Sequence, residues 1–474
     1  MKRTLIKILF VFFITPLLFS QEKIELKNAD ELTGKTEGED NIREATGNVH
    51  FIHGRVTVYC NSATQYIDQN RVILRGNVRI YQDTISLFTD RATYFGNDSK
   101  AICEGGVTLK DPNATLRAND GIYMFNEAKA VFTGDVIIVN PDYRITSNEL
   151  TYFRNTEESY CKGNVVVKTD SSVIKAEYLD YFSKQKKTYA REKVSIEKDS
   201  MIIVSDTLTD YANEKKSIAS GNVIINDYKS DLSASGDYLE NYEDKLFTLI
   251  KGNARLIQVD EENDTLFIYG NILEAYREKP EYYIAKDSVN IIRGDFLSKC
   301  GIAYYYTGGD EEKDVVTLNI EPVVWQKDMQ MTADSIYAEI VENKINKVYA
   351  RKLSNIPNSQ YSFLISKGDS NFADRFDQIK GYNITMNFVE DKLSIVDVDT
   401  NSNGIYYAYD KNKANGINII SGDFMTIYFD EDQKVYKVKV TGGAKGEYAP
   451  EEKLNAVERK LPGFNLRSDK PERR

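Results

Sequence analysis

A 29-residue repeat limits what this chain can fold into. The motif Gly-Asn-Val, or a close variant of it, begins at residues 47, 76, 105, 134, 163, 192 and 221, each 29 residues after the last. Looser copies begin at Gly252 and Asp287. A fixed period of this size is typical of repeat architectures, in which one unit cannot bury its apolar face alone and neighbouring units must stack.

Four positions of the repeat keep one character. The third is Val in all seven strict copies, the fifth and twelfth are large and apolar, and the fourteenth is small; Leu232 and Ala234 end the last two columns. Positions three and five, like twelve and fourteen, are two apart, so each pair points to one side of an extended strand. Polar turns such as residues 95–100 follow. Each unit therefore predicts two or three short strands and no helix.

The first position of the repeat predicts a sharp corner, because Gly tolerates a positive φ. Asp and Asn recur near position fifteen, which indicates hydrogen bonding at these corners rather than catalysis. Equivalent residues of stacked units are expected about 4.8 Å apart, one strand spacing. Cys103 and Cys161 lie two units apart in one column, at about 9.6 Å on this spacing. That separation is too long for a disulfide, so we expect both to be unpaired and buried.

The ends of the chain differ from the repeats. Residues 1–20 have a basic start, an apolar run through Phe19 broken only by Lys7, and Ser20 at the end, which indicates a secretory signal peptide. A retained anchor is the alternative, although the run is shorter than the ~20 residues that span a bilayer. We predict a regular repeat domain at 21–292, a second, less regular β domain at 293–449, and a polar C-terminal tail at 450–474. The tail should be mostly extended or disordered, with residues 461–464 as a candidate docking motif.

Composition argues against several function classes. The net charge of −11 is unlike that of a general nucleic-acid binder. His50 and His53 are the only histidines, which leaves almost no room for His-based metal sites or a Ser-His-Asp triad. We therefore expect no metal, no cofactor and no enzymatic activity.

Several stretches resemble the OstA-like family, whose members include the lipopolysaccharide-transport bridge protein LptA and the periplasmic domain of LptD. They are the recurring Gly-Asn-Val, Lys-containing hairpin turns, and segments such as residues 90–94 and 119–123. The resemblance covers residues 25–290 and, more weakly, 320–447. It implies an all-β fold, an open twisted β-jellyroll or "taco" built here from the 29-residue repeats of short antiparallel strands. The acyl chains of lipopolysaccharide would lie in a groove between two sheets.

The resemblance also implies a function, a location and partners. It predicts non-enzymatic lipopolysaccharide (lipid A) binding and transport to the outer membrane by a periplasmic protein, and it allows an association with the outer membrane itself. The partners would be lipopolysaccharide, other lipopolysaccharide-transport proteins bound by edge-strand pairing, and further copies joined end to end. The candidate groove lining consists of Val78, Val107, Val136, Val165, Leu87, Leu116, Ile145, Ile174 and Ile203.

Other interpretations remain open. The apolar columns could form a dry core, and the chain would then be a closed β-solenoid surface scaffold or adhesin without lipid. A parallel β-helix enzyme acting on polysaccharide is disfavoured, because the strict repeats do not vary in length and so have no long catalytic loop. Position 25 is basic in six of seven units, and it is either a rail for lipid phosphates or a row of turn residues whose acidic neighbours offset repulsion. The sequence favours turn residues; the column contains Arg71, Lys100, Lys129, Lys187, Lys216 and Lys245, interrupted by Glu158.

Overall fold

The computed structural model describes residues 22–473 except 39, 113, 261–262, 309–312, 343, 368–371, 373, 391 and 411–412. The signal-peptide prediction for residues 1–20 lies outside the described residues. The described chain is all-β, as predicted, and its helices are three short 3-10 segments, η1 (Ser183–Gln185), η2 (Ala212–Glu214) and η3 (Glu451–Ala456). No helix in these ranges is long and apolar enough to cross a membrane.

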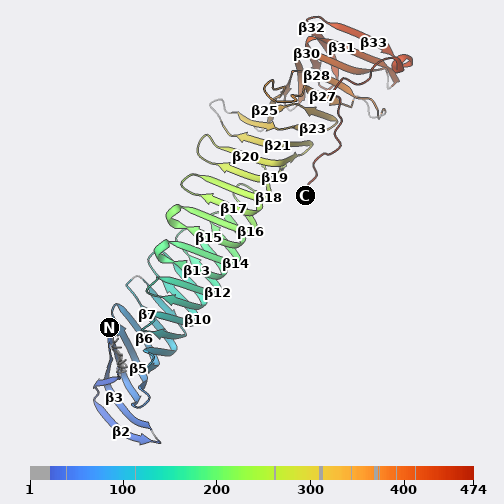
Figure 1. Cartoon of the computed structure of the whole chain (residues 1–474). Coiled ribbons are helices and arrows are strands. Elements are labelled where there is room, and N and C mark those ends of the chain that lie inside the picture. Colours follow the sequence, from blue (N-terminus) through green and yellow to red (C-terminus); the bar gives the residue numbers. More distant parts are fainter. Residues whose placement is uncertain are drawn as a thin grey trace, which may run out of the picture. The chain divides into compact units, whose positions relative to one another are not determined.

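The chain divides into two compact units, Met1–Asp170 and Ser171–Arg474. The predicted domain boundaries at 292 and 449 stay a prediction. The first unit is a series of antiparallel strands (Figure 1). These strands are β1 (Glu25–Asn28), β2 (Glu31–Glu37), β3 (Asp40–His53), β4 (Val56–Tyr66), β5 (Arg71–Gln82), β6 (Ile85–Phe95), β7 (Lys100–Lys110), β8 (Thr115–Ala118), β9 (Asp120–Met124), β10 (Lys129–Val139), β11 (Arg144–Phe153) and β12 (Glu158–Lys168).

The second unit continues with antiparallel strands and has shorter, less regular ones after β21. The regular strands are β13 (Val173–Phe182), β14 (Lys187–Lys198), β15 (Met201–Tyr211), β16 (Lys216–Asp227), β17 (Leu232–Tyr242), β18 (Phe247–Val259), β19 (Thr265–Tyr276), β20 (Tyr282–Arg293) and β21 (Phe296–Tyr306). The others are β22 (Asp314–Asn319), β23 (Val323–Gln326), β24 (Met329–Thr332), β25 (Ser335–Val341), β26 (Lys344–Arg351), β27 (Ser362–Ser366), β28 (Asp377–Gly381), β29 (Asn383–Val389), β30 (Lys392–Asp410), β31 (Lys413–Phe429), β32 (Val435–Thr441) and β33 (Lys445–Pro450).

Each 29-residue repeat is a hairpin of two strand paths, one running out and one running back. In the first unit β5, β7, β10 and β12 begin at residues 71, 100, 129 and 158. Because an antiparallel strand lies between equivalent strands, equivalent residues are two strand spacings apart, about 9.6 Å. The expected 4.8 Å stacking was therefore wrong by a factor of two. Cys103 and Cys161 are four spacings apart, and both are buried and outside any disulfide, as predicted.

The repeat motif forms a corner at which the strand bends. Gly134 and Asp135 both have positive φ, 77° and 47°, and the pairing of β10 with β11 shifts register beside them. A bulge of this kind bends the strand and allows its two halves to belong to two facing sheets. Asn119 covers the corner: its N–H donates to the Gly134 carbonyl at 2.8 Å, and its Nδ2 donates to Asp135 Oδ2 at 3.1 Å. The predicted hydrogen bonding by position fifteen is present here.

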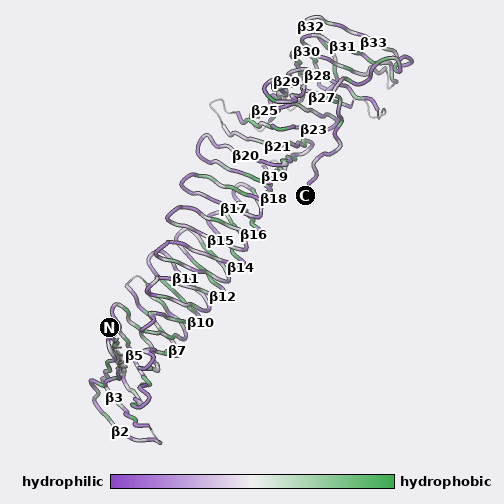
Figure 2. The backbone as a smooth tube through the Cα atoms, viewed as in Figure 1, coloured by the Kyte–Doolittle hydropathy of each residue, from purple (hydrophilic) through white to green (hydrophobic). Residues whose placement is uncertain are grey.

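The apolar faces of the bent strands form the cores. Figure 2 shows hydrophobic residues along the strands and hydrophilic ones at most turns. In the second unit one core cluster unites residues from both halves of the strands, such as Ala285 and Ile291. The column assignment needs one correction: Ala234 pairs with Ile225, and Gly236 pairs with Val223. Ala234 therefore occupies the twelfth column, because the strand runs two residues longer there, and Leu232 lies beyond it.

Exchange of the corner glycine tests this construction. A Cβ on Gly134 would lie 2.7 Å from Asn119 Nδ2, whereas a Cβ on Gly105, at the equivalent corner with φ of 75°, would meet nothing within 4 Å. Gly105→Ala should cost about 1–2 kcal/mol from left-handed backbone strain alone. Gly134→Ala should cost about 1–3 kcal/mol more, because Asn119 must also move. Urea denaturation of both variants checks this, and equal losses would contradict the role given to Asn119.

Candidate functional site

The predicted lining residues of the first unit lie on the inner face and are packed. Hydrogen-bonded register places Val78, Thr89, Val107 and Ala118 in one ladder, and Leu87, Leu109 and Leu116 in the next. None of the seven predicted lining residues from Val78 to Val165 is more than 5% exposed; these are Val78, Leu87, Val107, Leu116, Val136, Ile145 and Val165. In this unit these residues form a core.

An aromatic cluster also fills the side of the first unit away from the corners. His53, at the end of β3, shares a 2.8 Å hydrogen bond between its Nδ1 and the hydroxyl of Tyr94 near the end of β6. The rings of Tyr94 and Phe125 are 5.9 Å apart, and those of Tyr123 and Phe125 are 4.6 Å apart. All four side chains are buried. We call His53, Tyr94, Tyr123 and Phe125 the aromatic lock, because it joins strand halves from opposite sides of the corner.

The second unit has an inner apolar ladder that remains partly open to solvent. It begins at Ile174 and crosses eight neighbouring strands, about 34 Å at the normal strand spacing. Its members pair in sequence and are called here the open ladder: Ile174, Ile196, Ile203, Ile225, Ala234, Leu256, Ile268 and Ile291. Five of them are only half-buried, among them the predicted lining residues Ile174 and Ile203. Two of the residues predicted to line a groove, Ile174 and Ile203, thus belong to an apolar surface that solvent can reach.

The other half of these strands carries a polar ladder on the same inner face. It lies two residues beyond the buried column that contains Leu208 and Ala219, so its side chains point inward too. We call this row the polar lip: Tyr181, Thr188, Asp210, Ser217, Asn241, Thr248, Ala275 and Tyr283. Two pairs of its members are hydrogen-bonded to each other: Ser217 Oγ donates to Asp210 Oδ1 at 2.7 Å, and Thr248 Oγ1 donates to Asn241 Oδ1 at 2.8 Å.

Burial affects the protonation of one residue of the polar lip, Asp210. The pKa of Asp210 is raised above its ordinary value mainly because burial disfavours the carboxylate, while the hydrogen bond from Ser217 acts in the opposite direction. Arg277 reaches the lip from its exposed end, and its Nη1 donates to Thr248 Oγ1 at 2.7 Å. The inner surface of residues 171–293 therefore combines an aliphatic strip with a hydrogen-bonding strip, as an amphiphile would require.

The basic column has a structural explanation. Its side chains lie over aromatic rings on neighbouring strands: Arg71 is 4.2 Å from the Tyr66 ring centroid, Lys100 is 5.1 Å from Phe95, and Lys216 is 5.0 Å from Tyr242. Cation–π contacts of this kind each contribute about 0.5–1 kcal/mol at exposed sites. They favour the interpretation as turn-proximal structural residues over that of a phosphate rail.

Sequence reasoning missed the aromatic lock and the polar lip, although a signal was present. Tyr94, Tyr123, Tyr152 and Tyr181 recur every 29 residues, and Asp210 takes the next place. Tyr94 and Tyr123 are buried, whereas Tyr152, Tyr181 and Asp210 are only partly buried, so the column opens before Tyr gives way to Asp. Within the described ranges, no cluster of three or more His, Cys, Asp or Glu residues could hold a metal ion.

Comparisons with known proteins agree with this architecture. Residues 21–177 match the family described as OstA-like protein. Residues 144–295 match the family described as LptA/(LptD N-terminal domain) LPS transport protein. No curated protein matches the sequence.

Two solved structures show limited similarity. LptH, described as the LptA homologous periplasmic component of the lipopolysaccharide transport device from Pseudomonas aeruginosa, is 14% identical with a TM-score of 0.23, covering 25% of this chain and 82% of its own. The WD40 domain of SCAP from fission yeast is 8% identical with a TM-score of 0.10, covering 88% of this chain and 90% of its own. Both scores are too low to carry an argument. The two family matches together span residues 21–295, and over these residues the chain is similar to the OstA-like family and to the LptA/LptD N-terminal family of lipopolysaccharide-transport proteins.

Proposed function

We propose that this protein is a non-enzymatic periplasmic carrier that binds lipopolysaccharide by its lipid A part and moves it towards the outer membrane. The observation that carries the proposal is the open ladder opposite the polar lip in the second unit. The acyl chains would lie along Ile174, Ile196 and Ile203 and further along the ladder. The sugar and phosphate groups would lie at the lip and in solvent.

The energetics suit a cargo that must be released. Fully burying an aliphatic side chain contributes about 1.5–3 kcal/mol, so completing the burial of each half-buried one contributes about 1 kcal/mol. Five such side chains give a modest, non-directional gain that many contacts share. The contribution of the seven buried candidate lining residues, Val78 to Val165, would be indirect, since they hold the sheets together.

A second candidate function rests on the closed interior of the first unit. Its packed ladders and aromatic lock are what a dry β-solenoid scaffold or adhesin would need. Under that alternative the half-open ladder would stay empty of lipid. The two functions are separated by whether the inner face of the second unit binds an amphiphile.

Substitution on one strand tests the carrier proposal with a built-in control. Ile203 and Val204 are neighbours on β15; Ile203 faces inward on the open ladder, and Val204 faces the other side and is 39% exposed. Ile203→Asp should weaken lipid loading about five-fold, the equivalent of about 1 kcal/mol. Val204→Asp should leave loading unchanged. Lipid A bound per purified protein is measured by mass spectrometry, and equal loading of both folded variants would contradict the proposal.

Asp210 predicts a pH dependence. Its folded-state pKa lies above the unfolded value, so the folded chain holds the proton more tightly. The stabilisation of the protonated form is present below the unfolded pKa near 3.8 and is lost as pH rises through the raised pKa. Asp210→Asn should therefore be more stable than wild type at pH 7, with the difference shrinking towards pH 3. Thermal melts across this range check it; a constant difference would indicate that Asp210 is not buried as described.

Edge strands support the proposed partners. β2 is exposed along its whole length, and β32 and β33 each pair only with β31 among the described pairings. Unpaired edges can add strands from another chain. We expect concentration-dependent, end-to-end association with further copies and with other lipopolysaccharide-transport proteins. Light scattering over a wide concentration range checks the first; a strict monomer would count against edge pairing.

A further inference from the structure

The C-terminal tail, predicted to be extended or disordered, is an extended segment bound to the second unit. After β33 and η3 it runs back beside β27 and β23 towards β19 (Figure 1). It covers the sheet face opposite the main core, where Phe363, Ile365 and Ile405 form a second, smaller cluster with Leu454 and Leu461 of the tail. The tail thus covers part of this apolar face, beside residues of the loop before β28 such as Phe376.

Two buried glutamines hold the tail by its backbone. Gln378 Nε2 donates to the Arg459 carbonyl at 2.9 Å, and Gln378 Oε1 accepts from the Leu461 N–H at 2.8 Å. Gln330 repeats the arrangement with the Asn465 carbonyl and the Arg467 N–H, both at 2.7 Å. Donating to one residue and accepting from the residue two positions later is how a residue of a parallel strand pairs with its neighbour. Each glutamine side chain therefore makes the two hydrogen bonds that one residue of a neighbouring parallel strand would make to the tail.

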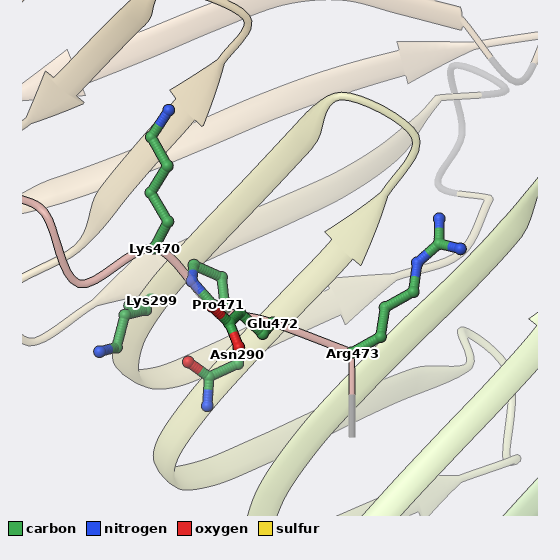
Figure 3. A pocket seen from close by; sticks show the side chains of 6 residues that line it. All are labelled: Asn290, Lys299, Lys470, Pro471, Glu472 and Arg473. Carbon is green, nitrogen blue, oxygen red and sulfur yellow. The ribbon is translucent and has the colours of Figure 1, made fainter.

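Side chains of the tail add selectivity. Phe464 lies 6.4 Å from the ring of Phe363 and 6.0 Å from that of Phe376. Further along, Lys299 Nζ donates to Asp469 Oδ2 at 2.7 Å. Figure 3 shows this end, where residues 470–473 pass beside Lys299 and Asn290. Two apolar anchors, two amide clamps and one ion pair make a recognition pattern for an extended peptide.

The tail is attached to the sheet more weakly than the strands are. Its apolar contacts come chiefly from Leu461 and Phe464, while Leu466 is 48% exposed. η3 is fixed independently, because Arg375 pairs with Glu451. Segments with few buried contacts open at a lower free energy than the core strands, so residues 457–473 can detach while η3 stays in place.

We propose that this face is a peptide-binding site whose resident ligand is the chain's own tail, and that it accepts the same tail from a second copy. Gln330 and Gln378 bind only the extended backbone of the tail. The side chains that give selectivity, Leu461, Phe464 and Asp469, are present in every copy. The resident tail competes at the high effective concentration of a short tether. Exchange therefore links two molecules through their C-terminal segments, independently of their edge strands.

The test uses the full chain with its own tail weakened. Leu461→Asp/Phe464→Asp removes both apolar anchors, and a fluorescein-labelled peptide of residues 457–474 is then titrated while anisotropy is followed. The variant should bind this peptide about ten-fold or more tightly than the wild-type chain, because the tethered competitor has been removed. Trp325 is the only tryptophan, and its Nε1 donates to Gln330 Oε1 at 3.3 Å, so its fluorescence should change on binding.

Control variants and a scrambled peptide separate specific recognition of the tail from non-specific binding. Adding Gln330→Met and Gln378→Met should abolish binding, whereas Gln326→Met, on β23 of the same sheet, should not. Two differently tagged wild-type chains should co-purify more strongly after incubation than two chains carrying Leu461→Asp/Phe464→Asp, which can associate only through their edge strands. A scrambled peptide that binds equally well, absence of saturable binding to the folded variant, or equal co-purification with and without the anchors would overturn the proposal.

Discussion

The structure depends on a corner at which two successive residues adopt left-handed backbone. Such a pair shifts the strand register and bends the strand, and its recurrence every 29 residues aligns all corners of the regular region. Glycine makes the conformation inexpensive, and at most corners, Gly105 excepted, an Asn or Asp of a neighbouring strand covers it. Glu192 and Lys193 adopt the same geometry without glycine, so the neighbouring strands impose the corner even where the local sequence resists it.

Once the corners are aligned, the residue types on the inner face determine whether the interior is a closed core or a partly open surface. Where the column beyond the buried one contains Tyr94 and Tyr123, the rings join the two strand halves and the aliphatic columns are buried. Where it contains Asp210 and Asn241, the side chains bond to neighbours along the sheet, and the aliphatic ladder opposite stays half-open. One repeat can therefore supply both a closed core and a partly open apolar surface, the surface to which we assign lipid in the proposed function, with the same strand and corner pattern.

Sequence reasoning predicted the repeat, the all-β fold, the corner glycines and the family, because these follow from periodicity and backbone sterics. It missed the number of strands per stacking step, because period alone does not show that the return strand lies between equivalent strands. It placed Val78 and Leu116 with Ile203 as one lining, since a ladder position predicts which face a residue occupies and not how closely the opposite sheet approaches. Of the bound tail, only residues 461–464 were singled out, as a candidate docking motif, and the backbone attachment on either side of them was missed. The tail's sequence is polar and weakly patterned, and its attachment depends on Gln330 and Gln378, distant in sequence.

The central claim is that acyl chains contact the inner face of the second unit. The most direct measurement places a photo-crosslinking amino acid at Ile203, and in a separate chain at Val204, and irradiates the protein in a Gram-negative envelope. The account predicts a lipopolysaccharide adduct from position 203 and none from position 204. An adduct from 204 alone, or from neither position while the protein is folded and exported, would contradict it and favour a closed scaffold.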